Sequence, residues 1–541
     1  MPYYIAKGGS NLYRVTTGGT ATALTLPTGV SEISGRRPRF TVLGRAVIVT
    51  NAFSVSLLVD PDFNVYPMQL RPPVSAPTLT SAVAGSLSGN FRVKYTHIIK
   101  DPLSGRIIAE SDFSPISAES GTITSKRLKA VVEVSQDPGV THRRLYRTTT
   151  GPGTTYFPWI DLEGNTLTAV SDDMSDALLQ LVASPTGLGS APGMVPGTFM
   201  PVVTEWKDRL WGVGGDENDV DILRYTEIEQ PYAWKTSNDF NIPPVGFDQF
   251  GITGLLPRRD ELGVLKRNFF VKIIGDGTRF ERVKVHTGKG CYATESCLVI
   301  DDVGYFLGED GVYTWGGQNL ACISDGAVRQ WFTTDTYFNR AQYPNAFAKY
   351  NAKYHGYELH LAAAGSSNID RWVFYDIARG KWWGPHKTDA FTPTSAQGFF
   401  LDSNSIFVPV TGASNGKIYK GNQTGFSDAT TDDIAISAQT GRMSADTPNI
   451  KKLFLGPSFI FKSQAAAGNL QVECYIGDLE ATTTFNGVLR TLSIDQTNDN
   501  RQDFSPLGTG EYCSFLFTET TNSQGCQLFG FELPSHELGQ R

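Results

Sequence analysis

The stretch VGYFLGEDGVYTWGG, residues 303–317, spells out a structural unit that recurs along this chain. Its two arms are rich in aromatic and β-branched residues and flank Asp310-Gly311, a pair that favours a two-residue type I′ turn. Because side chains alternate between the faces of a strand, each arm has an apolar face. These faces carry Tyr305 and Leu307 in the first arm, and Tyr313 and Trp315 in the second. The stretch therefore predicts a β-hairpin turning at Asp310-Gly311.

Similar paired arms recur, which indicates a repeat. They lie at residues 45–66, 206–226, 261–274, 354–377 and 405–420. A repeat of roughly 40 to 55 residues, with four short strands and a late aromatic residue, is typical of β-propeller blades. Two stacked sheets remain an alternative arrangement for strands this short. The first strands, within residues 2–15, are expected to complete the last blade and close the ring.

The composition and net charge limit the classes of function that the chain can have. The chain has 541 residues, of which 19% are charged and 11% aromatic, and its net charge is −7 with a pI of about 5.6. Its length predicts several domains, and the mixture suits a β-rich protein with many turns. The acidic balance disfavours tight nucleic-acid binding through a basic patch.

Cysteines and hydropathy give expectations about the cellular compartment. The six cysteines, three of them at 291, 297 and 322, form no Cys-x-x-Cys pair, so buried reduced thiols are expected. The start MPYYIAKGGS has no basic region followed by an apolar core, so we expect no signal peptide. No apolar run approaches 18 residues, so we expect no membrane span.

Two further regions differ from the repeats. After Pro72-Pro73, alternating strands with turns about every ten residues predict an all-β sandwich, and RRLYRTTT with YFPWIDLEGN resembles late strands of fibronectin type III-like modules. Past Gly425 the repeats stop, and strands resume in a C-terminal β-sandwich. The fold class is thus all-β, a β-propeller with an inserted fibronectin type III-like β-sandwich and a C-terminal β-sandwich. The predicted parts are residues 1–74 (first propeller strands), 75–183 (inserted sandwich), 184–198 (linker), 199–426 (propeller blades) and 427–541 (C-terminal sandwich for oligomerisation or docking).

No motif nominates catalytic, metal-binding or cofactor-binding residues, so we expect a protein that is not an enzyme and has no cofactor. Asp310 to Trp315 has the spacing of the sialidase Asp-box, but the glycine falls one position early, and that box is a turn motif. GGDENDVD (residues 214–221) partly matches a calcium loop, but Asp221 stands where an EF-hand needs glycine, which favours a solvated hairpin loop. His355 and His360 are five apart, so they lie on opposite faces of a strand and cannot share a metal ion. Three tryptophans (Trp372, Trp382, Trp383) suit blade-core packing better than a sugar platform.

Four segments in order carry a family resemblance: RLWGVGG…ILRYTEIEQPYAW, ELGVLKRNFFVKIIGDG, VGYFLGEDGVYTWGG and VFYDIARGKWW. Together they resemble the propeller of tail nozzle proteins (tail-tube terminal or tail hub proteins) of short-tailed bacteriophages. The resemblance covers about residues 1–70 and 200–425, and the module inserted after Pro72-Pro73 also suits that family. The chain is shorter than the largest members, which puts any fibre-docking insertion in doubt.

The resemblance implies a structural protein of the virion tail, made in the host cytoplasm. It implies a ring of several copies, six being expected, that extends the DNA-ejection channel below the head-to-tail adaptor. The outside of the ring would dock tail fibres or tailspikes, and genomic DNA would pass through the lumen without specific binding. An acidic wall would repel phosphates, and Asp216, Glu217, Asp219 and Asp221 are the candidate channel-lining residues.

Two other functions stay open. A glycan-binding propeller adhesin would present exposed aromatic side chains to a host receptor. A glycan hydrolase would need convergent carboxylates that the sequence does not reveal.

Overall fold

The computed structural model is built almost entirely from β-strands and divides into two compact units, residues 1–387 with 392–421, and residues 388–391 with 422–541. It describes residues 3–537 apart from gaps of one or two residues and the following longer stretches: 102–104, 136–139, 183–199, 214–219, 243–249, 388–392, 396–398, 402–406, 421–426, 429–431, 440–442, 444–450, 462–467, 478–488, 495–499, 504–507 and 520–527.

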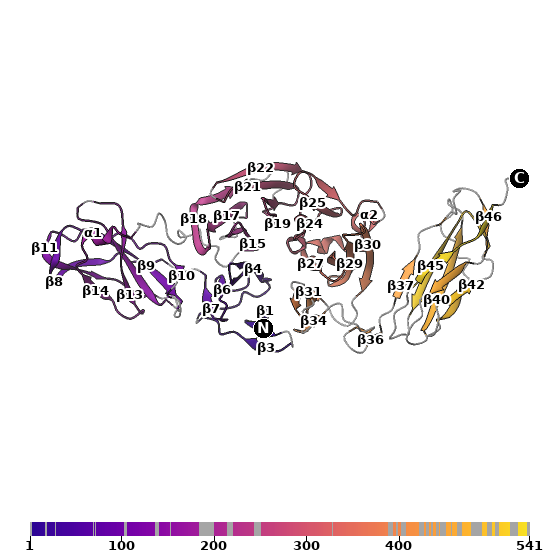
Figure 1. Cartoon of the computed structure of the whole chain (residues 1–541), viewed down its shortest axis with the longest axis horizontal. Helices are drawn as coiled ribbons and strands as arrows, with labels where there is room; N and C mark the ends of the chain where they lie inside the picture. Colours follow the sequence, from indigo (N-terminus) through magenta and orange to yellow (C-terminus); the bar gives the residue numbers. More distant parts are fainter. Residues whose placement is uncertain are drawn as a thin grey trace. The chain divides into compact units, whose positions relative to one another are not determined.

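The first unit contains a propeller of seven small antiparallel sheets, six of them with four strands (Figure 1). Each sheet is a set of strands consecutive in sequence, as the repeat predicted. Sheet 1 is β1 (Tyr3–Gly8), β2 (Asn11–Thr16) and β3 (Ala21–Ala23); sheet 2 is β4 (Arg39–Leu43), β5 (Ala46–Thr50), β6 (Leu57–Val59) and β7 (Val65–Pro67); sheet 3 is β15 (Val202–Trp206), β16 (Arg209–Val213), β17 (Ile222–Glu227) and β18 (Gln230–Asn241).

The remaining four sheets follow the inserted region without interruption. Sheet 4 is β19 (Gly254–Pro257), β20 (Glu261–Leu265), β21 (Phe269–Gly275) and β22 (Phe280–Thr287); sheet 5 is β23 (Leu298–Ile300), β24 (Val303–Leu307), β25 (Val312–Trp315) and β26 (Leu320–Cys322); sheet 6 is β27 (Phe347–Asn351), β28 (Gly356–Ala362), β29 (Ile369–Asp376) and β30 (Lys381–Lys387); sheet 7 is β31 (Pro393–Ser395), β32 (Phe399–Leu401), β33 (Phe407–Ala413) and β34 (Ile418–Lys420). The short helices η1 (Thr294–Ser296), α2 (Arg329–Thr333) and η2 (Arg340–Asn345) lie between these strands.

The ring is continuous. The first strands of neighbouring sheets lie side by side, β4 with β15, then β19, β23 and β27, and β27 contacts β33 of sheet 7. Sheets 1 and 2 share a core that includes Leu12 and Leu57, and Tyr4 of sheet 1 packs against Val410 of sheet 7. Each interface is an apolar layer between two sheet faces, which explains why the propeller strands carry apolar side chains on both faces.

The hairpin at residues 303–317 is confirmed, but its predicted turn is wrong. Leu307 pairs with Val312, so the loop has four residues, and the amide of Gly308 donates to the carbonyl of Gly311. Neither Asp310 nor Gly311 has a positive φ. Gly311 is required by a close approach instead, because a Cβ there would lie 2.3 Å from the hydroxyl oxygen of Ser324.

The prediction that the first strands complete the last blade is also wrong. Residues 3–23 form a sheet of their own, instead of adding a strand to the last blade. β1 and β2 are joined by a turn at Gly9-Ser10, and β2 then pairs with β3, so these strands satisfy one another.

Residues between β7 and β15 form the inserted region, a four-stranded and a three-stranded sheet around one apolar core. The core includes Phe91, Val93 and Tyr95. The four-stranded sheet is β10 (Ile107–Glu110), β9 (Val93–Lys100), β12 (His142–Arg147) and β13 (Phe157–Glu163), and the three-stranded sheet is β14 (Ala169–Asp172), β11 (Ile123–Val131) and β8 (Thr78–Gly89), followed by α1 (Asp176–Leu179).

The second unit is a separate set of sheets around a core that includes Phe459, Cys474 and Phe515. Its strands are β35 (Ser427–Asp428), β36 (Asp432–Asp433), β37 (Ile436–Gln439), β38 (Lys452–Phe454), β39 (Ser458–Phe461), β40 (Gly468–Gly477), β41 (Leu489–Ile494), β42 (Asn500–Asp503), β43 (Gly508–Gly510), β44 (Tyr512–Glu519), β45 (Leu528–Glu532) and β46 (Ser535–Glu537). The main sheet has the order β37-β44-β40-β41. Two three-stranded sheets have the orders β43-β38-β46 and β42-β39-β45.

Candidate functional site

The centre of the propeller is crossed by an ion cluster of Arg37, Arg39 and Glu295. One guanidinium nitrogen of Arg37 lies 2.8 Å from a Glu295 carboxylate oxygen, and Arg39 hydrogen-bonds the other oxygen. The Glu295 side chain is 7% exposed, whereas those of Arg39 and Arg37 are 19% and 35% exposed. The cluster therefore pairs a buried carboxylate with two cations that are 256 and 258 residues away in sequence.

These contacts link sheets that are not neighbours. Arg39 begins β4 of sheet 2, and Glu295 lies in η1, just before β23 of sheet 5. Two sheets separate them on one side of the ring and three on the other, so the contact crosses the middle. Arg39 also donates to the carbonyl of Pro201 before sheet 3, and Arg37 to that of Asn345 before sheet 6. Four of the seven sheets are thus tied together at one end of the axis, which we call the axial clamp.

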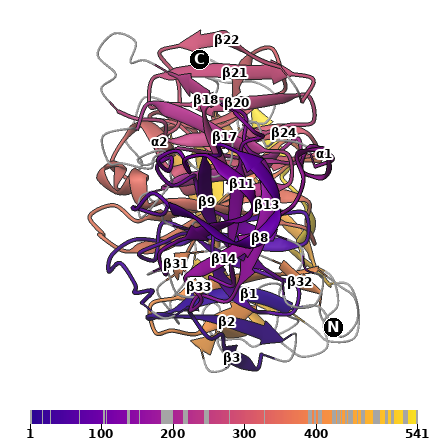
Figure 2. The same ribbon diagram turned by 90° about the vertical axis from the view of Figure 1, so that its left-hand side faces the viewer.

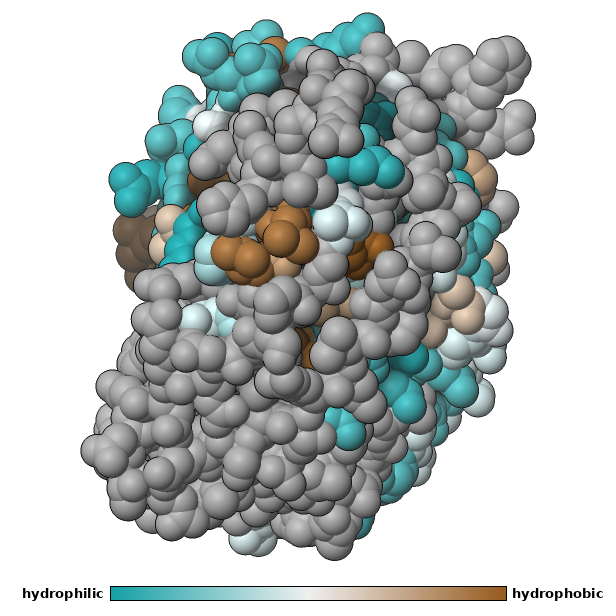
Figure 3. Space-filling model, turned by 90° about the vertical axis from the view of Figure 1, so that its right-hand side faces the viewer, coloured by the Kyte–Doolittle hydropathy of each residue, from teal (hydrophilic) through white to brown (hydrophobic). Residues whose placement is uncertain are grey.

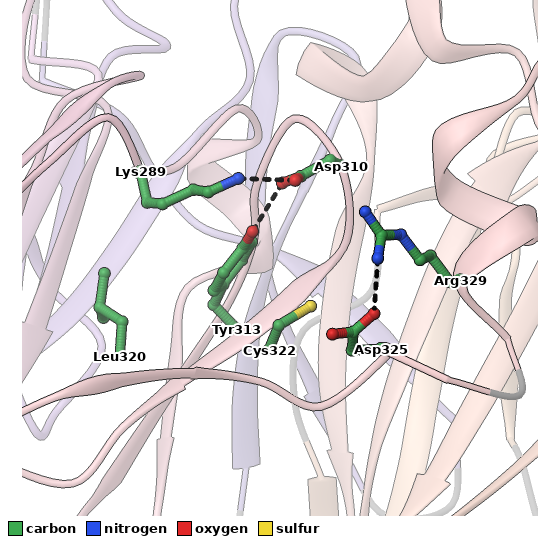
Figure 4. A pocket seen from close by; sticks show the side chains of 7 residues that line it. All are labelled: Lys289, Asp310, Tyr313, Leu320, Cys322, Asp325 and Arg329. Atoms are coloured by element: carbon green, nitrogen blue, oxygen red, sulfur yellow. Dashed lines mark hydrogen bonds and ion pairs between the residues drawn. The ribbon is translucent and has the colours of Figure 1, made fainter.

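A pocket of about 350 Å³ opens on sheet 5, beside the hairpin at residues 303–317 (Figure 4). Lys289 and Tyr313 both point to Asp310, with the ammonium and the phenol oxygen each 2.6 Å from a carboxylate oxygen. Burial raises the pKa of Asp310, but the hydrogen bonds from Lys289 and Tyr313 outweigh burial, so its pKa is lowered overall. Burial and the bond to Asp310 raise the pKa of Tyr313.

The opposite wall of this pocket is also paired internally. Arg329 at the start of α2 lies 3.2 Å from Asp325, and the thiol of Cys322 contacts the hydroxyl of Ser324 at 3.5 Å. A general acid for glycoside hydrolysis needs a carboxyl whose pKa is raised. Asp310 has the opposite shift, so its carboxyl does not suit that role. A second pocket of about 300 Å³ is lined by a further ion network around Arg258, Glu261 and Lys272.

A buried polar cluster joins sheets 6 and 7. Glu358 of β28 lies 2.7 Å from the ammonium of Lys349 and 2.9 Å from Nε2 of His360, and Lys349 donates to the hydroxyl of Thr411 in β33. Burial raises the pKa of Glu358, but Lys349 and His360 together outweigh it and lower its pKa to about 2. Burial lowers the pKa of His360. The cluster is a fixed ionic contact within the ring wall.

The predicted acidic loop is mostly outside the described residues. Asp216, Glu217 and Asp219 belong to that part of the chain, so the structure gives no place for them. Asp221 is described, and one of its carboxylate oxygens lies 2.7 Å from the ammonium of Lys266, whose side chain is fully buried. Asp221 therefore neutralises a buried cation, a role that the sequence gave no reason to expect.

The three candidate tryptophans do not form one exposed platform. Trp382 donates its indole N–H to the carbonyl of Ile323, and Trp372 stacks on His386 with ring centroids 4.1 Å apart. Trp383 alone of the three is largely exposed, at 54%. His355 directly precedes β28 and has a positive φ. In the part of the chain that the structure describes, no group of three His, Cys, Asp or Glu side chains is placed to hold a metal ion, and no helix is long and apolar enough to cross a bilayer.

Exposed apolar side chains gather on the inserted region. Nine of the sixteen large apolar side chains found exposed among the described residues lie within residues 74–182, about a fifth of the chain. Figure 2 faces this region, with β8, β11 and β14 in view. Figure 3 shows further apolar side chains of described residues, in brown, seen from the other side. We call the exposed set on the inserted region the sandwich patch: Val74, Val83, Ile116, Val131, Val134, Leu167, Leu178, Leu181 and Val182.

Strand β8 lies at the edge of this patch and was missed by the sequence analysis. It is 12 residues long, occupies the edge of its sheet, and contains neither a charged residue nor proline. Val83 near its middle is 71% exposed. Natural proteins protect long edge strands with charges, proline or bulges. The edge strand β13 of the other sheet carries Pro158, Asp161 and Glu163, whereas β8 has no such residue and its pairing with β11 shifts register at two places.

Comparisons with known proteins add little beyond the fold. No protein-family model and no curated protein matches the chain. Among solved structures, YCF48 from Cyanidioschyzon merolae matches with 11% identity over 59% of this chain and 95% of that one, at a TM-score of 0.25. The extracellular domain of the putative one component system BT4673 from B. thetaiotaomicron matches with 8% identity over 97% of this chain and 78% of that one, also at 0.25. At these scores the matches carry no argument about this chain.

Proposed function

We propose that this chain is a structural, non-catalytic subunit of a bacteriophage tail nozzle. In this proposal several copies, six being expected, form a ring below the head-to-tail adaptor in the virion. DNA leaves through the opening that the copies enclose, without specific binding, and tail fibres or tailspikes dock outside. The proposed family rests on the resemblance of the four ordered sequence segments. Two features of the structure, the sandwich patch and the axial clamp, favour assembly into a ring.

The sandwich patch is the observation that carries the proposal. More than half of the exposed large apolar side chains of the described residues lie on this one region, and apolar side chains that form a contiguous exposed patch mark interaction sites. At one end of the three-stranded sheet, hydrogen bonds hold the main chain that carries part of the patch. The Glu133 carboxylate accepts from the amide of Val74 at 2.7 Å, and Arg143 donates to the carbonyls of Glu133 and Leu167. A fixed apolar surface next to an edge strand that has neither a charged residue nor proline suits contact with a second copy.

The axial clamp explains why a channel would need several copies. Arg37, Arg39 and Glu295 connect four sheets across the middle of the propeller. A DNA duplex therefore has no path along the axis of a single chain. A wide opening would have to be enclosed between chains, as in a nozzle ring, where each propeller is a solid part of the wall.

Assembly of the purified full-length chain tests this proposal. We expect native mass spectrometry and negative-stain images to show closed rings whose population grows with concentration. Val83→Lys places a charge on the edge strand and should raise the concentration needed for assembly at least tenfold. Val42→Lys, at a propeller position that is 55% exposed, is the matched control and should assemble normally.

Two outcomes would overturn it. A chain that remains monomeric at all concentrations, with the V83K and V42K variants indistinguishable from it, would exclude the sandwich patch as an interface between copies. Saturable binding of a glycan by that monomer would favour the adhesin instead, and release of reducing sugar would favour the hydrolase.

A further inference from the structure

Two thiols, Cys291 and Cys297, meet at the base of the turn that carries Glu295. Their Sγ atoms are 3.4 Å apart, and both cysteines are free. Cys291 is fully buried, whereas Cys297 is partly exposed. The five residues between them include η1, so the two sulfurs lie at the two ends of one short turn.

The packing around the sulfurs leaves nothing between them. A Cβ on Gly254 would lie 2.4 Å from Sγ of Cys297 and 3.6 Å from Sγ of Cys291, so the absence of a side chain there makes room for both. The main chain at Cys291 is held on both sides. Its amide donates to the carbonyl of Lys266, and its carbonyl accepts from the hydroxyl of Thr253 at 2.7 Å.

The other two thiols that are close in the fold lack this arrangement. Cys474 and Cys513 lie on neighbouring strands of the second unit, but Cys513 is opposite Ile476 and Cys474 is opposite Phe515. Cys322 contacts the hydroxyl of Ser324. Cys291 and Cys297 are the pair of described cysteines whose sulfurs are shown in contact.

We propose that Cys291 and Cys297 are a modification site, a dithiol that a small-molecule disulfide converts to an intramolecular disulfide. The thiolate of the partly exposed Cys297 attacks one sulfur of the oxidant RSSR, which forms a mixed disulfide and releases RS⁻. The thiolate of Cys291 then attacks Sγ of Cys297 and releases the second RS⁻. The two thiols lose two electrons and two protons in total, and RSSR becomes two RSH.

The bond would secure the axial clamp. The turn between the two cysteines carries Glu295, and it also carries Ser296, whose hydroxyl accepts from the amide of Leu307 and whose carbonyl accepts from Tyr357. A link between the ends of the turn limits the conformations that it can adopt when it opens. The oxidised protein should therefore hold the Glu295 carboxylate against Arg39 for a larger fraction of the time.

The reaction should be slow at neutral pH. The hydrogen bond to Cys291 and burial raise the pKa of Cys297 well above its usual value, and the charge of Arg39 offsets this only in part. Because the thiolate is the nucleophile, the rate should rise about tenfold for each pH unit below that pKa.

The test uses the folded full-length chain and oxidised glutathione. After acid quenching and denaturation, alkylated thiols are counted by mass spectrometry, and the disulfide is located by peptide mapping. We expect the six thiols to fall to four, with Cys291 linked to Cys297, and faster loss at pH 8.5 than at pH 7. The C291S and C297S variants should form no bond at this turn, whereas C513S should still form it.

Three results would overturn the proposal: six thiols that persist at pH 8.5, glutathione that stays on Cys297 with Cys291 still reduced, or a bond mapped to other cysteines. Mapping of the wild-type chain decides this even if a serine variant fails to fold. Hydrogen exchange then tests the clamp. Slower exchange of residues 292–296 after oxidation supports it, and unchanged exchange contradicts the proposed effect on Glu295.

Discussion

Glu295→Gln is the most informative change to the axial clamp, because it removes a charge while keeping the shape of the side chain. The carboxylate is 7% exposed and faces two guanidinium groups. After the change, the amide still accepts one hydrogen bond, but its NH₂ group opposes an arginine donor. Arg39 is left as a mostly buried cation whose remaining assigned partner is the carbonyl of Pro201.

The magnitude follows from how far each arginine can reach water. Removing one partner of a fully buried pair costs about 3–5 kcal/mol, and breaking an exposed pair costs about 0.2–1 kcal/mol. Arg39 at 19% exposure is near the first case and Arg37 at 35% near the second, so screening reduces its share. We expect the free energy of opening at the clamp to fall by about 2–3 kcal/mol. That corresponds to roughly 30- to 150-fold faster exchange, since 1.4 kcal/mol is a factor of ten.

Hydrogen exchange followed by mass spectrometry measures the free energy of opening at the clamp itself. A local measurement is needed because a chain of several domains does not unfold in one step. The peptides to follow cover residues 35–41 and 291–298. Asp325→Asn is the matched control, because its ion pair with Arg329 is 59% and 63% exposed and should change exchange about twofold or less. If E295Q and D325N change exchange equally, Glu295 does not hold the ring together and the clamp is refuted.

Two further predictions concern the walls of the ring. The pKa of Glu358 is about 2 in the folded chain against 4.5 ordinarily, and the pKa of His360 is lowered from 6.5, so both groups stabilise the fold at neutral pH. As the pH falls below 6.5, protonation of His360 in the unfolded chain should lower the stability measured in urea. Protonation of Glu358 should lower it by about 3 kcal/mol more between pH 4.5 and pH 2. H360Q should lose less stability than wild type between pH 6.5 and 5, and equal losses would show that His360 is not responsible. Gly263→Ala places a Cβ 2.8 Å from the Trp315 ring between sheets 4 and 5, so it should lower stability by about 1–3 kcal/mol, measured by thermal unfolding. G316A, where a Cβ meets nothing within 4 Å, is the control, and equal melting temperatures for the two variants would contradict this packing.

The alternation of apolar and polar residues predicted the blades because each blade pairs strands that follow one another in the sequence. The arms around residue 310 are apolar on both faces, and the structure buries Tyr305 and Tyr313 in two different cores between sheets. The turn was wrong because Gly311 is required by the approach of Ser324, which no local pattern shows.

The features on which the proposed function rests were missed for two reasons. Strand β8, TLTSAVAGSLSG, has serine, alanine and glycine where a strand normally alternates apolar and polar side chains, so periodicity gives little signal. The axial clamp joins residues more than 250 positions apart, and its charges look like ordinary surface charges in the sequence. Asp221 also looks like an ordinary surface charge in the sequence, but its partner Lys266 lies in the loop between β20 and β21.

Imaging the particles formed by the purified full-length chain tests the ring-forming role most directly. The account predicts closed rings of several copies around one central opening, with density filling the middle of each propeller and with assembly weakened by V83K but not by V42K. Monomers at every concentration, or propellers with an open axis of their own, would contradict it.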